Sequence, residues 1–134
     1  MSDGARVGIV LVSHSAALAD GAAELAGQVA GGTVAVIPAG GTDDGGLGTS
    51  IAKVRRAIFA AHAGAGVVLV PDLGSSVLTV RTLLAEDSAL PEPLALADAP
   101  FVEGAVAATV IAAAGGDFKA VLGAAEEARN ARKL

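Results

Sequence analysis

The sequence predicts an α/β domain in which helices cover both faces of a parallel β-sheet. Short runs of β-branched and aliphatic residues alternate along the chain with longer segments whose apolar residues recur at helical spacing. The connections are short, and no internal repeat or linker divides the chain. Strands that alternate with helices join in parallel through right-handed crossovers, which place helices on both faces. We therefore expect one three-layer α/β/α domain over residues 1–134.

The composition excludes several classes of protein. The 134 residues are 53% hydrophobic but only 2% aromatic, so the core of one domain must consist mainly of Ala, Val, Leu and Ile. A formal charge of −5 disfavours binding of nucleic acid, and the absence of cysteine excludes disulfides and thiolate metal sites. No apolar run reaches the roughly 20 residues of a membrane-spanning helix. We expect a cytoplasmic protein that binds neither nucleic acid nor a membrane.

Four strands are predicted from apolar runs that end at turn residues. Residues 7–12 and 67–70 are continuous in β-formers, which is typical of strands that are buried on both faces. Residues 33–37 form the second strand, which we expect Pro38 to close, and a short fourth strand covers residues 94–97.

Five helices are predicted from apolar spacing and from capping residues. They run over residues 17–29, from Thr49 or Ser50 to 62, from Ser75 or Ser76 to 86, over 102–113 and over 117–132. Most of the apolar side chains in the first three are expected to face the sheet. These are Leu18, Ala22, Leu25, Ala26 and Val29, then Ile51, Val54, Ile58 and Phe59, then Val77, Val80, Leu83 and Leu84. The almost wholly apolar fourth helix is expected to be buried on all sides, partly in a dimer interface.

Polar residues gather at the carboxyl ends of three predicted strands, which is the edge where open α/β sheets bind ligands. Residues 13–15 (Ser-His-Ser) follow the first strand, residues 42–49 follow the second, and residues 72–76 follow the third. If the first and third strands are neighbours, His14 and Asp72 lie within reach of a hydrogen bond.

A histidine beside a carboxylate is suited to carry a phosphoryl group. One ring nitrogen must be bare, and a carboxylate on the other N–H fixes the tautomer and stabilises the imidazolium, a role that Asp72 could fill for His14. The helix N-termini near residues 48–50 and 74–76 offer N–H groups and hydroxyls to the phosphoryl oxygens. No basic residue is close in sequence, so a partner would bring any cation. We expect no cofactor and no metal.

Each of these residues also has a purely structural interpretation. His14 fits a hydrogen-bonded loop residue equally well, Asp72 fits a turn, and residues 75–76 fit helix caps. Residues 43–44 (Asp-Asp) are typical of a solvated turn, and His62 is expected at the surface, where its charged form favours a helix C-terminus. Their joint placement at one edge favours the functional interpretation. Dinucleotide-binding, P-loop, nucleophile-elbow and zinc-protease motifs are absent.

Four stretches resemble the IIA domain of the mannose class in the phosphoenolpyruvate-dependent phosphotransferase system. They are residues 11–15 (LVSHS), 48–50 (GTS), 70–76 (VPDLGSS) and 99–105 (APFVEGA), and they extend from the first strand into the fourth helix. The resemblance implies a flavodoxin-like sheet of order 2-1-3-4, in which the first and third strands are adjacent. It also implies a homodimer.

The resemblance further implies a phosphohistidine relay. His14 would accept a phosphoryl group from the phosphocarrier HPr, and Asp72 would orient its ring. The residues expected at the phosphate are Ser15, Gly48, Thr49, Gly74, Ser75 and Ser76. We expect a shallow docking surface around His14, to which Leu47, Leu73 and Val77 contribute.

The residues that follow Asp72 indicate one branch of this family. Residues 73–76 (Leu-Gly-Ser-Ser) stand where sugar-specific members have Phe-Gly-Gly-Ser, which favours the branch serving bacterial dihydroxyacetone kinase. In that branch the phosphoryl group passes to ADP on the DhaL subunit, and DhaK binds dihydroxyacetone. Some members continue into further carrier domains, whereas this sequence ends at Leu134, so we expect separate carriers. Two alternatives stay open: a IIA component of a sugar transporter, and a regulatory module that phosphorylation switches.

Overall fold

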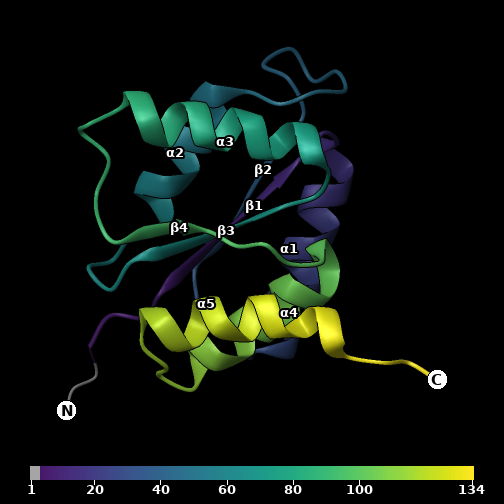
Figure 1. Ribbon diagram of the computed structural model, residues 1–134, viewed down its shortest axis with the longest axis vertical. Helices are drawn as coiled ribbons and strands as arrows, with labels where there is room; N and C mark the ends of the chain where they lie inside the picture. Colours follow the sequence, from purple (N-terminus) through teal and green to yellow (C-terminus); the bar gives the residue numbers. More distant parts are fainter. Residues whose placement is uncertain (1–3) are drawn as a thin grey trace.

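The protein is built on a four-stranded parallel sheet in the order β2-β1-β3-β4. The structure, a computed structural model, describes residues 4–134, so the first three residues of the domain predicted over 1–134 lie outside the described part. The strands are β1 (Gly8–Ser13), β2 (Val36–Gly40), β3 (Val67–Pro71) and β4 (Leu94–Leu96). The predicted α/β class and the strand order are confirmed (Figure 1).

Five helices cover the two faces of this sheet. They are α1 (Ala16–Val29), α2 (Ile51–Ala61), α3 (Gly74–Glu86), α4 (Phe101–Ala113) and α5 (Phe118–Glu127), with a short 3₁₀ helix at Ala128–Asn130. Figure 1 shows α2 and α3 on one face, and α1, α4 and α5 on the other. None of the helices in residues 4–134 has the length and apolar character required to cross a membrane.

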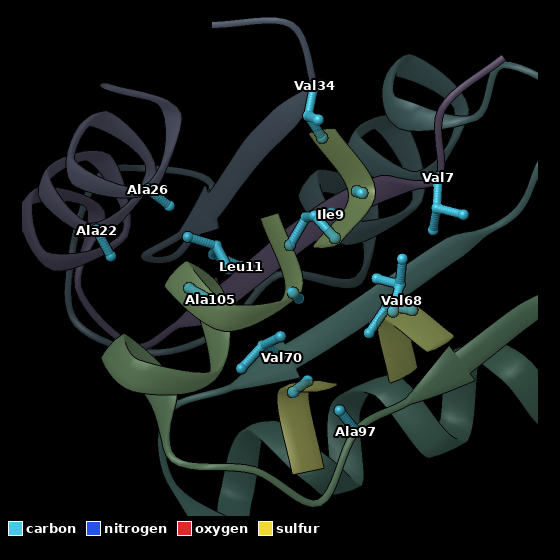
Figure 2. Close-up of a cluster of buried hydrophobic side chains, with 14 residues drawn as sticks. Val7, Ile9, Leu11, Ala22, Ala26, Val34, Val68, Val70, Ala97 and Ala105 are labelled. Carbon is cyan, nitrogen blue, oxygen red and sulfur yellow. The ribbon is translucent and has the colours of Figure 1, made fainter. Parts of the chain in front are cut away.

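The central strand β1 is buried on both faces and divides the core in two. Successive side chains of a strand point to opposite faces. Ile9 and Leu11 pack with α1, α4 and α5, whereas Val10 and Val12 pack with α2 and α3. Figure 2 shows the first of these two clusters, in which small alanines from the helices meet the branched side chains of the sheet. Because β1 is buried on both faces, the position of its carboxyl end, where the polar residues begin, is fixed.

The face that α1 presents to the sheet differs from the prediction. Its buried residues are Ala19, Ala22 and Ala26, while Leu18, Leu25 and Val29 are 45%, 48% and 55% exposed. The reason is a close approach between α1 and the end of β2. A Cβ on Gly40 would lie 2.5 Å from the Ser15 carbonyl oxygen and 2.8 Å from Ala19 Cβ. At that distance only methyl groups fit, so the leucines lie on the outer flank of the helix.

Other predicted inward side chains are also exposed. In α2, Val54 and Ile58 are buried as predicted, but Ile51 and Phe59 are 45% and 44% exposed. The Phe59 ring instead lies under the Arg55 guanidinium, 4.8 Å from it. In α3 the buried apolar residues are Val80 and Leu83, and Val77 and Leu84 are half-buried. In α4, Val102 and Val110 are 38% and 41% exposed in the single chain, and their burial in a dimer interface stays a prediction.

The end of β2 differs from the prediction, whereas the start of α2 agrees with one of the two predicted caps. Pro38 lies inside β2 rather than closing it, which is tolerated because β2 is an edge strand. Ser50, not Thr49, caps α2 by accepting from the Lys53 N–H.

His62 ends α2 and ties it to the loop before β4. Its Nδ1 accepts from the Gly64 N–H at 3.0 Å, and its Nε2 lies 3.0 Å from the Glu92 carbonyl oxygen. His62 is thus half-buried and hydrogen-bonded at both ring nitrogens, rather than free at the surface.

Candidate functional site

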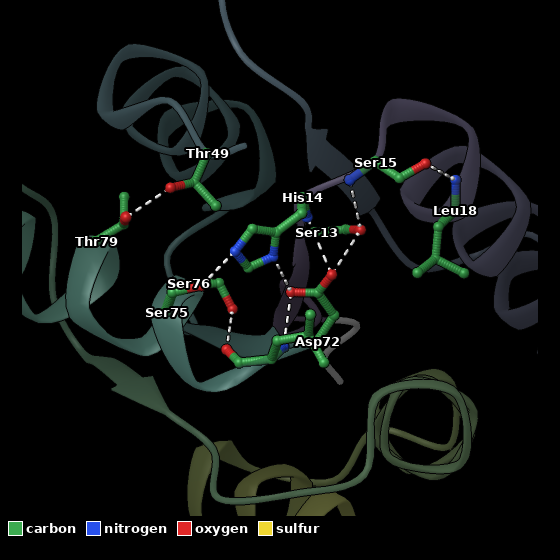
Figure 3. Close-up of polar contacts among 10 residues, drawn as sticks. Ser13, His14, Ser15, Leu18, Thr49, Asp72, Ser75, Ser76 and Thr79 are labelled. Carbon is green, nitrogen blue, oxygen red and sulfur yellow. Dashed lines mark hydrogen bonds and ion pairs between the residues drawn. The ribbon is translucent and has the colours of Figure 1, made fainter. Parts of the chain in front are cut away.

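The candidate site lies where β1 and β3 end side by side. In the parallel ladder Val12 is paired with Pro71, and one further hydrogen bond runs from the Asp72 N–H to the Val12 carbonyl. This register places Asp72 directly beside Ser13 and His14 (Figure 3). The expected approach of His14 and Asp72 is therefore present: His14 Nδ1 lies 3.0 Å from Asp72 Oδ1.

The Asp72 carboxylate is held by four donors. Its Oδ1 accepts from the His14 ring and from the Leu73 N–H at 2.7 Å. Its Oδ2 accepts from the Ser13 hydroxyl at 2.9 Å and from the His14 N–H at 3.0 Å. Burial opposes ionisation of this carboxyl, but hydrogen bonds from the His14 N–H, the Ser13 hydroxyl, the His14 ring and the Leu73 N–H together hold its pKa below the usual range. Asp72 is therefore a carboxylate at neutral pH.

An ionised Asp72 fixes the tautomer of His14. A carboxylate only accepts hydrogen bonds, so the proton on the ring must be on Nδ1, and Nε2 keeps a lone pair. Nε2 lies 2.5 Å from Ser75 Oγ at the start of α3. The His14 side chain is 24% exposed, against 7% for Asp72. The ring with the free lone pair thus lies partly at the surface, while the carboxylate behind it is largely buried.

Of the residues expected at the phosphate, Ser75 alone has a side chain in contact with His14. Gly74 and Ser75 are the first residues of α3, so their N–H groups have no acceptor within the helix. Leu73 precedes them as the N-cap without a side-chain bond, whereas Ser75 or Ser76 had been predicted to open this helix. The buried Ser76 hydroxyl instead donates to the Leu73 carbonyl at 2.7 Å.

The other expected phosphate residues make structural contacts around the ring. Ser15 caps α1 by accepting from the Leu18 N–H. The Gly48 N–H donates to the His14 carbonyl at 2.9 Å, which pins the glycine-rich loop beside the histidine. The Thr49 hydroxyl lies 2.6 Å from the Thr79 hydroxyl of α3. Their roles at a phosphate stay predictions.

Ser13 was predicted only as one of the polar residues at this edge, and the sequence did not indicate which group its hydroxyl would bind. It is fully buried, its hydroxyl donates to Asp72, and its oxygen accepts from the Ser15 N–H at 3.0 Å. A signal for it was present in the sequence, since it is the one hydroxyl in a strand that is otherwise wholly apolar.

The acidic pair after β2 stabilises its own loop. Asp43 accepts from the Ser50 hydroxyl, and Asp44 accepts from the Thr42 hydroxyl and from the Gly46 N–H. Within residues 4–134, no group of three His, Cys, Asp or Glu side chains is arranged to hold a metal ion.

Exposed apolar side chains lie on the two loops that flank His14. Leu47, on the pinned loop, is 84% exposed, and Leu73, beside Asp72, is 62% exposed. Leu73 and Val77 line a groove of about 360 Å³ that also includes Asp72 and Arg81. This surface is shallow and open, as expected for contact with another protein rather than for a buried small-molecule site.

Comparison with known proteins relates most of the chain to one family. Residues 8–122 match the family EIIA-man, described as the PTS system fructose IIA component. The phosphoryl donor subunit DhaM of PEP-dependent dihydroxyacetone kinase from Providencia stuartii is 37% identical over 131 residues. The alignment covers 95% of this chain but only 28% of that protein, so the chain spans less than a third of this relative.

Shorter relatives match over most of their length. The DhaM subunit of dihydroxyacetone kinase 2 from Listeria innocua is 38% identical, with 78% of this chain and 84% of that protein aligned. The crystal structure of a protein of unknown function is similar throughout, with a TM-score of 0.80 and 34% identity over 96% of this chain and 97% of that one.

Proposed function

Because the chain belongs to the EIIA-man family of phosphotransferase-system IIA components, we propose that it is a phosphoryl donor subunit of the DhaM type, with His14 as the carrier residue. The observation that carries the proposal is the 3.0 Å contact of His14 Nδ1 with Asp72 Oδ1, which leaves Nε2 as the nucleophile. In this role the chain supplies a dihydroxyacetone kinase whose other subunits are DhaK and DhaL.

The first transfer takes a phosphoryl group from HPr. The lone pair of His14 Nε2 attacks phosphorus, and the Nε2–P bond forms as the bond between phosphorus and the carrier breaks. The ring then carries a positive charge, which the Asp72 carboxylate stabilises through Nδ1–H. The reaction requires mainly positioning, because donor and acceptor have similar phosphoryl potentials.

Groups at the start of α3 serve the phosphoryl oxygens. The Ser75 hydroxyl, which lies at Nε2 before transfer, turns to donate to a phosphoryl oxygen. The free N–H groups of Gly74 and Ser75, with the positive end of the helix dipole, are suited to bind the remaining charge.

The second transfer passes the group to ADP on DhaL. An oxygen of the terminal ADP phosphate attacks phosphorus, the Nε2–P bond breaks, and the ring returns to its neutral form with ATP on DhaL. In the described part of the chain no Lys or Arg forms a hydrogen bond or an ion pair with His14 or Asp72. In this proposal the partner supplies the cations that neutralise the nucleotide phosphates.

HPr and DhaL use the same surface in turn, since both must reach Nε2. Leu47, Leu73 and Val77 form the apolar part of that surface.

We also propose that the protein is a cytoplasmic homodimer. The exposed Val102 and Val110 of α4 support the dimer. Light scattering at micromolar concentration tests the dimer, and a monomeric mass would contradict it.

The relay is tested by reconstitution with a matched pair of variants. The protein, mixed with phosphoenolpyruvate, enzyme I and HPr, should become an acid-labile, base-stable phosphoprotein. His14→Ala should accept no label, whereas His62→Ala, which removes the other histidine, should accept it as the parent does. Label retained in His14→Ala would overturn the proposal.

The acceptor is tested by adding DhaK, DhaL, ADP and dihydroxyacetone to the phosphorylated protein. Release of label from His14 with formation of dihydroxyacetone phosphate is the expected result. A protein that is phosphorylated but transfers nothing to bound ADP would instead be a regulatory module or a component of a sugar transporter.

A further inference from the structure

We propose that Ser13 is a positioning residue that orients the Asp72 carboxylate and thereby keeps the His14 proton on Nδ1. The inference rests on the proposed function, since it concerns the same histidine. Ser13 makes no side-chain contact with the imidazole; its hydroxyl lies behind Asp72, fully buried at the end of β1.

The two oxygens of Asp72 accept hydrogen bonds from different donors, and the Ser13 hydroxyl contacts only one of these oxygens. Oδ1 faces the His14 ring, while Oδ2 is gripped by the Ser13 hydroxyl at 2.9 Å and by the His14 N–H at 3.0 Å. Two donors on Oδ2 fix the rotation of the carboxylate plane, and this rotation determines where Oδ1 lies relative to Nδ1. Without the hydroxyl, a single backbone donor holds Oδ2.

The direction of the Ser13 hydroxyl is also fixed. A serine hydroxyl has one hydrogen and two acceptor lone pairs. The Ser15 N–H donates to the Ser13 oxygen at 3.0 Å and occupies one lone pair. The hydrogen of the hydroxyl then points to Asp72, whose carboxylate can only accept. The backbone N–H at the start of α1 thus sets the orientation of a hydroxyl, which in turn sets the orientation of the catalytic carboxylate.

This arrangement predicts a specific defect in Ser13→Ala. The side-chain volume is nearly unchanged, but Oδ2 loses a donor and the Ser15 N–H loses its acceptor. The loss also removes one of the hydrogen bonds that lower the pKa of Asp72. We expect a mixed tautomer at His14 and phosphoryl transfer from HPr slower by about tenfold.

The experiment measures the tautomer and the rate separately. Nitrogen-15 NMR of the His14 ring reports which nitrogen carries the proton, and single-turnover transfer from phosphorylated HPr reports the rate. Thr109→Val is a matched control, because it removes another fully buried hydroxyl, one that donates to Ala105 within α4. Ser13→Thr keeps the hydroxyl and should restore both readouts.

Failure of the inference about Ser13 can be distinguished from failure of the proposed phosphoryl relay. A Ser13→Ala protein with the parent tautomer and the parent rate would overturn the inference, as would an equal defect in Thr109→Val. If Ser13→Ala does not fold, Ser13→Cys replaces the hydroxyl by a slightly larger and much weaker donor, and must show the same defect. If the parent accepts no label, the proposed function fails, yet the tautomer measurement still decides the role of Ser13.

Discussion

Replacing Asp72 by asparagine tests the site most directly, because it keeps the shape of the side chain and changes only its chemistry. The amide must place an NH₂ where one carboxylate oxygen was. At the Oδ1 position that NH₂ would face the Leu73 N–H and the His14 ring, and at the Oδ2 position it would face the His14 N–H and the Ser13 hydroxyl. The hydroxyl and the ring can exchange donor and acceptor roles, but the two backbone N–H groups cannot.

One backbone N–H therefore loses its acceptor in either orientation. A buried donor without a partner costs about 1–3 kcal/mol; this cost is larger for the part-buried His14 N–H than for the exposed Leu73 N–H, which water can reach. Hydrogen bonds to a charged group are worth about 1.5–3 kcal/mol each. We expect Asp72→Asn to lower the free energy of unfolding by roughly 2–4 kcal/mol, measured by urea denaturation at pH 7.

The effect on transfer should be larger than the effect on stability. An NH₂ facing Nδ1 moves the ring proton to Nε2, which blocks the nucleophile, and an amide oxygen facing Nδ1 lacks the charge that stabilises the phosphorylated ring. In a histidine–aspartate pair of another enzyme class, the same change costs about 10⁴-fold. We expect a fall of about 10³–10⁴-fold in single-turnover transfer from phosphorylated HPr. A rate within tenfold of the parent would refute this account of Asp72.

The same variant should change the pH dependence of stability. The pKa of Asp72 is lowered on folding from its ordinary value of 3.8, so the carboxylate contributes stability that is fully present above that value. This contribution is lost as pH falls through the lowered pKa. The difference in unfolding free energy between parent and Asp72→Asn should therefore shrink below about pH 4. A difference that is constant between pH 7 and pH 3 would contradict the hydrogen-bonded carboxylate.

Three further substitutions test separate parts of the structure. Ser75→Ala should slow transfer about tenfold without loss of stability, since it removes the hydroxyl at His14 Nε2; an unchanged rate would exclude Ser75 from the phosphoryl site. Leu47→Ala should raise the KM for phosphorylated HPr several-fold while thermal unfolding stays the same, because this side chain is 84% exposed; an unchanged KM would exclude Leu47 from the docking surface. Gly8→Ala should destabilise the protein by about 3 kcal/mol in urea, because its Cβ would overlap the Ala61 carbonyl oxygen; a stability equal to that of the parent would contradict this packing.

The pattern of elements could be predicted from the sequence because strand and helix periods are local properties. The faces of the helices could not. In α1, the residues with the largest apolar side chains, Leu18, Leu25 and Val29, share a helical spacing, yet the alanines beside them face the sheet. The deciding factor is the distance between α1 and Gly40, which depends on tertiary packing.

The geometry of the site could likewise be predicted only in part. The proximity of His14 and Asp72 could be predicted from the sequence, since adjacent parallel strands place their carboxyl ends at one edge. The contacts of Thr49 with Thr79 and of Gly48 with the His14 carbonyl depend on the path of the glycine-rich loop, which no local pattern encodes. The partner of Ser13 could not be predicted, because the role of a hydroxyl at the end of a strand depends on the carboxylate that tertiary packing places beside it.

The site forms only when β1 pairs with β3, so its activity also reports whether the sheet has folded. Its two halves are 58 residues apart in the chain, and only the parallel register of Val12 with Pro71 brings them into contact. A partly folded chain with local helices but without this pairing has no carboxylate at His14. In a refolding experiment, competence to accept a phosphoryl group should therefore return with the slow, long-range strand pairing and later than helical circular dichroism. Each phosphorylated molecule reports that the centre of its sheet has formed in register.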